Sequence, residues 1–188
     1  MRRWLDHSRL VLALVVPFFS FVIALPASAQ TEREAAALDT LFAELRKAPD
    51  PASAQRLSVD IWNLWTRPDD PVLAARMSDV LQRLGMSDLS GAIAMLDQLV
   101  GDYPRYAEGW NQRATVHFLL RNFDQSLADI EKTLEIEPRH FGALAGRALI
   151  YLELDQRDLA LEAITRALTI HPFLSERGLL PELNALAI

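Results

Sequence analysis

The sequence predicts an all-α protein built as a right-handed solenoid of about four antiparallel helix pairs. Three prolines recur at intervals of 34 residues, at Pro104, Pro138 and Pro172. Small residues and large apolar residues keep the same interval between these prolines: Ala92, Ser126 and Ala160, and Leu96, Ile130 and Ile164. A fixed period of about 20 to 50 residues indicates stacked structural repeats, and roughly 34 residues is the length of one helix-turn-helix unit.

The first 29 residues have the pattern of a signal peptide. Arg2 and Arg3 form a basic start, residues 10–25 are almost entirely apolar, and Ala27–Ala29 has the small-x-small pattern of a cleavage site. We therefore expect a Sec-type signal, cleavage after Ala29, and a periplasmic or secreted mature protein. The alternative is an uncleaved membrane anchor, because 16 apolar residues fall just short of the roughly 17 to 25 that span a bilayer. Cleavage would leave no stable membrane insertion.

Charge and cysteine content exclude several classes of function. Cleavage removes three of the 19 basic and one of the 25 acidic residues, which leaves a formal charge of −8. An acidic chain of this kind is not expected to bind nucleic acid or an anionic membrane surface, since both require a concentrated positive face. The chain has no cysteine, which rules out disulfides, thiol catalysis and iron–sulfur clusters.

Residues 30–70 are predicted to form an opening pair of helices. Residues 31–47 place Leu38, Phe42 and Leu45 on one helical face, and the prolines around position 50 separate this helix from a second one that ends near Arg67. Moving the repeat register back by one unit places three residues of the second helix on the repeat's core positions: Ser58, Trp62 and Trp65. The sequence therefore predicts a degenerate terminal repeat here.

Six further helices are expected in three units, residues 73–104, 107–138 and 141–172. Asp88, Asn122 and Asp155 stand where a side-chain oxygen can cap the second helix of each unit. Each unit ends at a proline, which cannot continue the helical hydrogen-bond ladder. Residues 173–188 carry leucines at helical spacing and are predicted to form a capping helix over the last repeat.

These units resemble tetratricopeptide repeats (TPRs). The family's pattern of large and small residues falls on two of them most clearly: Trp110, Ala114, His117, Ser126, Ile130, Thr133 and Pro138, then Leu144, Ala148, Tyr151, Ala160, Ile164, Ala167 and Pro172. The resemblance covers about residues 39–172. It is weaker in the first unit, where Arg76, Asp79 and Arg83 occupy positions at which the family usually has core side chains.

No arrangement of residues points to catalysis, a metal site or a cofactor, so we expect none of these and predict that the protein is not an enzyme. The sequence has no HExxH pair, nucleophile elbow, Walker loop or dinucleotide turn. Each histidine of the mature chain has a structural explanation. His117 is expected in the core rather than as a ligand, His140 as a turn cap rather than a partner contact, and His171 at a helix C-terminus.

The resemblance implies a concave groove lined by the first helix of each pair. Carried onto this sequence, the expected partner-binding residues are Met77, Leu81, Glu108, Asn111, Thr115, Phe118, Ala145 and Leu149. The lysines and arginines that would clamp an acidic C-terminal tail are absent from these positions, so an apolar helix or extended peptide is the expected ligand. The alternatives are a groove covered by the N-terminal helix, or a structural protein that self-associates as a homodimer.

Overall fold

The computed structural model describes residues 31–185, and this part of the chain contains eight α-helices, two 3-10 helices and no strand. The helices are α1 (Glu32–Leu45), α2 (Pro51–Thr66), α3 (Pro71–Gly85), α4 (Leu89–Asp102), α5 (Ala107–Leu119), α6 (Phe123–Ile136), α7 (Phe141–Glu153) and α8 (Arg157–Ile170). The prediction of an all-α solenoid is confirmed. The predicted signal peptide, residues 1–29, lies outside the described residues.

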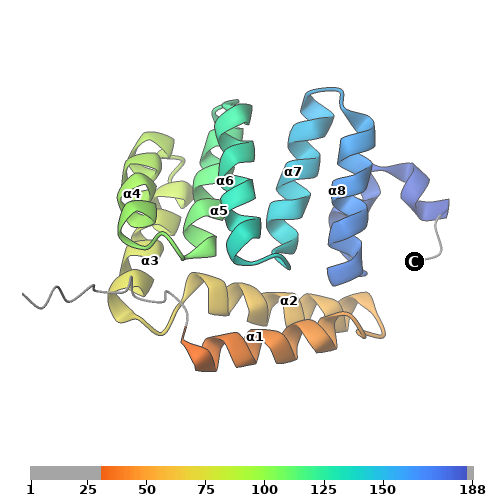
Figure 1. Cartoon of the computed structure of the whole chain (residues 1–188), viewed down its shortest axis with the longest axis horizontal. Helices are drawn as coiled ribbons and strands as arrows, with labels where there is room; N and C mark the ends of the chain where they lie inside the picture. Colours follow the sequence, from red (N-terminus) through yellow and green to blue (C-terminus); the bar gives the residue numbers. More distant parts are fainter. Residues whose placement is uncertain (1–30, 186–188) are drawn as a thin grey trace, which may run out of the picture.

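The three predicted repeat units form three helix pairs that stand side by side, α3–α4, α5–α6 and α7–α8 (Figure 1). Ala92, Ser126 and Ala160 are all buried, as expected for small residues where two helices cross. Ser126 also donates a hydrogen bond from its Oγ to the carbonyl oxygen of Ala114 on the partner helix, at 2.7 Å. The 34-residue interval therefore reports the real packing register.

The turn inside each pair also repeats. Ser87, Arg121 and Asp155 have φ of 59°, 60° and 58°, a left-handed conformation that non-glycine residues adopt only as single turn residues. Asp88 caps α4 as predicted, accepting a hydrogen bond from the amide of Gly91. The prediction that Asp155 caps α8 is wrong by one residue, because Asp155 takes up the left-handed turn and the next residue becomes the N-cap.

The first helix pair forms as predicted but does not continue the stack as a degenerate repeat. Figure 1 shows α1 and α2 running crosswise below the other helices, along the ends at which one repeat turns into the next. The apolar face of α2, which includes Ile61 and Trp65, is buried. It packs against those turns and the residues beside them, among them Phe141, rather than mainly against α3.

The predicted C-terminal capping helix is replaced by two 3-10 helices, η1 (Ser175–Leu179) and η2 (Pro181–Ala185). Pro181 explains the break, because proline has no amide hydrogen and disfavours helical geometry in the residue before it. Leu180 and Leu183 are nevertheless fully buried, and η1 contacts α8. The segment therefore covers the end of the stack as expected, with a different local structure.

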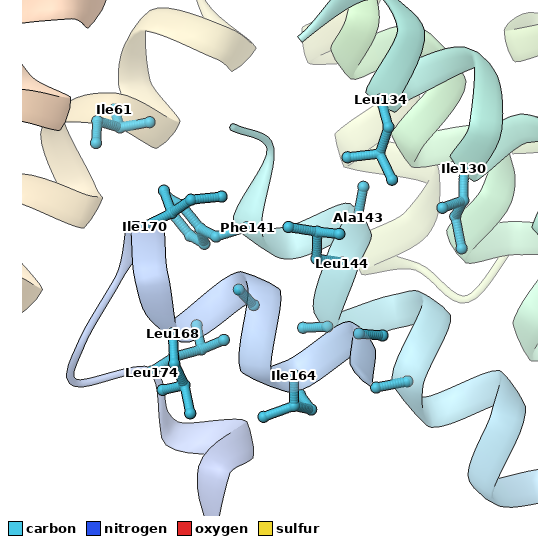
Figure 2. Close-up of a cluster of buried hydrophobic side chains, with 14 of the residues drawn as sticks. Ile61, Ile130, Leu134, Phe141, Ala143, Leu144, Ile164, Leu168, Ile170 and Leu174 are labelled. Atoms are coloured by element: carbon cyan, nitrogen blue, oxygen red, sulfur yellow. The ribbon is translucent and has the colours of Figure 1, made fainter. Parts of the chain in front are cut away.

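The core of the described residues divides into two clusters. The larger one joins α1 and α2 to the second and third repeats, and Figure 2 shows Ile61, Phe141, Leu144, Ile164 and Ile170 among its members. The smaller one belongs to α3, α4 and the start of the second repeat. The hairpin of α1 and α2 is thus part of the main core, packed against the second and third repeats.

Candidate functional site

A pocket of about 300 Å³ opens between α5 and α7. Ser126 and Ile130 of α6, Trp62 of α2 and Glu176 of η1 also contribute to its lining. The lining residues are Trp62, Asn111, Gln112, Ala114, Thr115, Phe118, Ser126, Ile130, Gly142, Ala143, Ala145, Gly146, Leu149 and Glu176. First helices of adjacent repeats therefore line the pocket, as the resemblance implied.

Five of the eight predicted groove residues line this pocket: Asn111, Thr115, Phe118, Ala145 and Leu149. Met77 lies elsewhere, fully buried in the core between α3 and α4. Leu81 is exposed on α3 and does not line the pocket. Glu108 is fully buried and so is not on the pocket surface. The predicted residues that line the pocket therefore all come from the second and third repeats.

Glu108 forms a buried hydrogen-bond network with the turn before α7. Its carboxylate accepts hydrogen bonds from Nδ2 of Asn111 at 3.1 Å, Nε2 of Gln112, and Nε2 of His140 at 2.9 Å. Nδ1 of His140 accepts the amide hydrogen of Ala143 at 3.1 Å, so the ring proton that Glu108 receives is on Nε2. The predicted turn-capping role of His140 is confirmed, and its complete burial rules out direct contact with a partner.

This network orients two amides of the pocket wall. A carboxylate offers only acceptors, so Asn111 and Gln112 must turn their amide nitrogens toward Glu108. Their oxygens then point away from it, and neither oxygen accepts a hydrogen bond from any other described residue. The hydroxyl of Thr115 donates to the carbonyl oxygen of Asn111 at 3.0 Å, which leaves its lone pairs free.

The α2 helix contacts three turns: the one before α5, the one before α7 and the one after α8. The hydroxyl of Tyr106 donates to the carbonyl oxygen of Trp65, and burial raises the pKa of Tyr106, which keeps the donor proton in place. The ring of His140 stacks on Trp65, and Nε2 of His171 lies 2.8 Å from Oγ of Ser58. These contacts seat Trp62 at the edge of the pocket.

Gly142 at the start of α7 allows this close approach. A Cβ atom at Gly142 would lie 2.8 Å from the benzo ring of Trp62, closer than real Cβ contacts. The glycine therefore lets Trp62 reach the pocket wall. The sequence pattern placed Trp62 on a core position of a degenerate repeat, and it gave no signal that Trp62 lines the pocket.

A separate polar layer lies between the first and second repeats. Arg113 of α5 pairs with Asp97 of α4 at 2.9 Å and with the buried Asp129 of α6 at 2.7 Å. The hydrogen bonds that Arg113 donates to the Asp129 carboxylate raise the pKa of Arg113. His117 is half-buried nearby, with Nε2 4.0 Å from Asp129. Arg113, between α4 and α6, thus has its charge balanced by two carboxylates.

Residues 31–185 contain no group of three side chains suited to holding a metal ion. Within the same part of the chain, no helix has both the length and the apolar character required to cross a bilayer. The polar groups around the pocket are amides, hydroxyls and one carboxylate, and they are arranged for hydrogen bonding.

The fold defines a protein built from stacked pairs of helices. A TPR repeat-containing protein of Rhizobium etli is 35% identical over 150 residues, which cover 80% of this chain and 72% of that protein. The chain therefore belongs to the TPR repeat-containing proteins, as the resemblance suggested. No family model matches the sequence.

Solved structures of MamA have a similar fold. The structure described as "MamA RS-1 ArsTM double mutant" has a TM-score of 0.53 and 16% identity, covering 81% of this chain and 84% of that one. The structure described as "Crystal structure of MamA" has a TM-score of 0.49 and 20% identity, covering 70% and 76%. At 16% identity, the structure with the TM-score of 0.53 supports a shared fold and says nothing about a shared function.

Proposed function

We propose that this protein is a non-catalytic interaction module of the periplasm or cell envelope, and that it binds a peptide or helix of a partner protein in the pocket between α5 and α7. The observation that carries the proposal is the pocket itself. Its walls come from the first helices of two adjacent repeats, and Phe118, Ala145 and Leu149 give it an apolar surface beside the amide of Asn111. This combination suits a segment that buries side chains and also hydrogen-bonds through its main chain.

Export is supported by the signal-peptide pattern and by the short distance between the predicted cleavage point and the start of α1. Cleavage after Ala29 would leave two residues before α1, whose N-cap is Thr31. Thr31 and Glu34 form a complete capping box, so the first helix would keep its N-terminal stabilisation. The predicted cleavage would therefore leave the hairpin of α1 and α2 intact.

Self-association is the alternative. The residues that line the pocket, Trp62 and Glu176 among them, come from a single chain. Sedimentation equilibrium of the mature protein at high micromolar concentration distinguishes the two functions. We expect a monomeric mass, whereas a dimer that dissociates in Leu149→Glu would favour self-association through the pocket.

The proposed function is tested by affinity capture from periplasmic extract. The parent, Asn111→Ala and Leu149→Glu serve as baits, with Leu119→Glu as the matched control, since Leu119 is 53% exposed and does not line the pocket. We expect both pocket variants to lose partners that the parent and the control retain. Equal capture by all four proteins would refute the pocket as the binding site.

A further inference from the structure

We propose that the pocket selects a partner segment in which a lysine or arginine lies beside apolar side chains. This inference rests on the proposed function and specifies the chemistry of the ligand. It is carried by the direction of the hydrogen-bonding groups around the pocket and by the charge at its border.

The wall of α5 presents acceptors. The Glu108 carboxylate accepts hydrogen bonds from the side-chain amide nitrogens of Asn111 and Gln112. The two amide oxygens therefore point away from the carboxylate. The hydroxyl groups of Thr115 and Ser126 donate their protons to main-chain carbonyl oxygens of α5, so only their lone pairs remain for a ligand. A ligand that brings hydrogen-bond donors therefore fits this wall better than a carboxylate, which brings only acceptors.

The border of the pocket carries an unpaired negative charge. Glu176 lines the pocket and accepts a hydrogen bond from the hydroxyl of Ser175 at 2.9 Å. Among the described residues, Glu176 takes part in no ion pair. No lysine or arginine is among the residues that line the pocket, so the pocket lining offers Glu176 no lysine or arginine partner. A ligand cation would supply that partner.

The aromatic border suits the same ligand. Trp62 lines the pocket and is only partly buried, and the face of an indole attracts lysine and arginine side chains. The apolar residues Phe118 and Leu149 can receive the hydrocarbon stem of such a side chain and its apolar neighbours. Acceptors, a carboxylate and an aromatic ring thus meet at one apolar pocket.

The test is a selection from a randomised 12-residue peptide display library on the immobilised mature protein. Binders are counter-selected on Leu149→Gln, which removes the apolar side chain without adding a charge, so that only pocket-dependent sequences remain. Enriched peptides are then synthesised in three versions, with the basic residue kept, changed to glutamine, or changed to glutamate, and measured by fluorescence anisotropy. We expect enriched sequences that combine apolar residues with lysine or arginine, and about fivefold weaker binding of the glutamine version.

The variant Glu176→Gln provides the matched measurement, because it keeps the shape of the side chain and removes its charge. It should retain binding of the glutamine version while losing most of the preference for the basic version. Pocket-dependent peptides without basic residues, or an unchanged preference in Glu176→Gln, would overturn this inference and leave the proposed function standing. If no enriched peptide depends on Leu149, the proposed function fails as well.

Discussion

The imidazole of His140 lies flat on the indole of Trp65, with ring centroids 3.9 Å apart and an interplanar angle of 6°. The two residues are 75 positions apart and come from the hairpin of α1 and α2 and from the turn before α7. The contact places the crosswise hairpin directly over the buried carboxylate of Glu108, to which His140 is hydrogen-bonded. The stack therefore joins the hairpin to the wall of the pocket.

Replacing Trp65 with alanine should destabilise the whole protein. Trp65 is 1% exposed, so its removal leaves a large cavity between α2 and the turns and should cost about 3 to 5 kcal/mol of unfolding free energy. Urea denaturation followed by circular dichroism measures the cost. Val59→Ala, on the exposed side of the same helix, is the control and should change stability by less than about 0.5 kcal/mol. A similar small effect of Trp65→Ala would contradict the docking of the hairpin.

Gly142→Ala and Gly146→Ala form a matched pair on α7. A methyl group at Gly142 meets Trp62 at 2.8 Å, whereas at Gly146 its nearest neighbour is Ile130 at 3.7 Å. Gly142→Ala should therefore push Trp62 away, shift the tryptophan fluorescence, and cost about 1 to 3 kcal/mol. Gly146→Ala should be neutral or stabilise the helix by up to about 1 kcal/mol. Equal effects of the two substitutions would argue against Trp62 at the pocket border.

Ala160→Leu tests the repeat register. Ala160 is fully buried where α7 and α8 pack together, so a larger side chain should overpack the crossing and cost about 1 to 3 kcal/mol. The neighbouring Leu159→Ala, at a position 43% exposed, serves as the control and should have little effect. Thermal unfolding measures both variants. An unchanged melting temperature for Ala160→Leu would contradict the register.

His171 should make the protein less stable in mild acid. Burial lowers the pKa of His171, although the main-chain hydrogen bond and the nearby Glu176 carboxylate oppose this effect. Its hydroxyl partner Ser58 donates to the carbonyl oxygen of Ala54 and so accepts from the ring. Below the ordinary histidine value of about 6.5, the unfolded chain binds a proton that the folded chain does not, so stability falls as the pH decreases.

The melting temperature of the parent should accordingly fall between pH 7.5 and pH 5.5, and it should fall less in His171→Gln. Glutamine at this position keeps a donor for Ser58 but has no group that titrates in this range. A parallel decrease in both proteins would show that His171 is not responsible.

The repeated part of the fold could be predicted from the sequence because each of its signals is local. Pro104, Pro138 and Pro172 mark the ends of the units, and the buried small residues mark where helices cross. The placement of α2 could not be predicted in the same way. Periodicity identified Trp65 as part of an apolar face, but it does not tell which partner that face meets, and the partner is His140.

The pocket was predicted in part for the same reason. Asn111, Phe118 and Leu149 follow from the helical positions that face the groove in the family. The burial of Glu108 depends on His140, which comes 32 residues later, and on the hairpin that covers both. Such a contact leaves no pattern within one repeat. Only the three-dimensional arrangement reveals that the Glu108 carboxylate orients the side chains of Asn111 and Gln112 and does not itself line the pocket.

Site-specific photo-crosslinking in the native cell tests directly whether a partner protein binds in the pocket between α5 and α7. A benzophenone amino acid in place of Phe118 lies at the pocket, and the same group in place of the next residue, Leu119, lies on an exposed surface outside it. We expect a discrete crosslinked adduct with a partner protein from position 118 and not from position 119. Adducts from position 119 alone, or the same adducts from both positions, would contradict binding in the pocket.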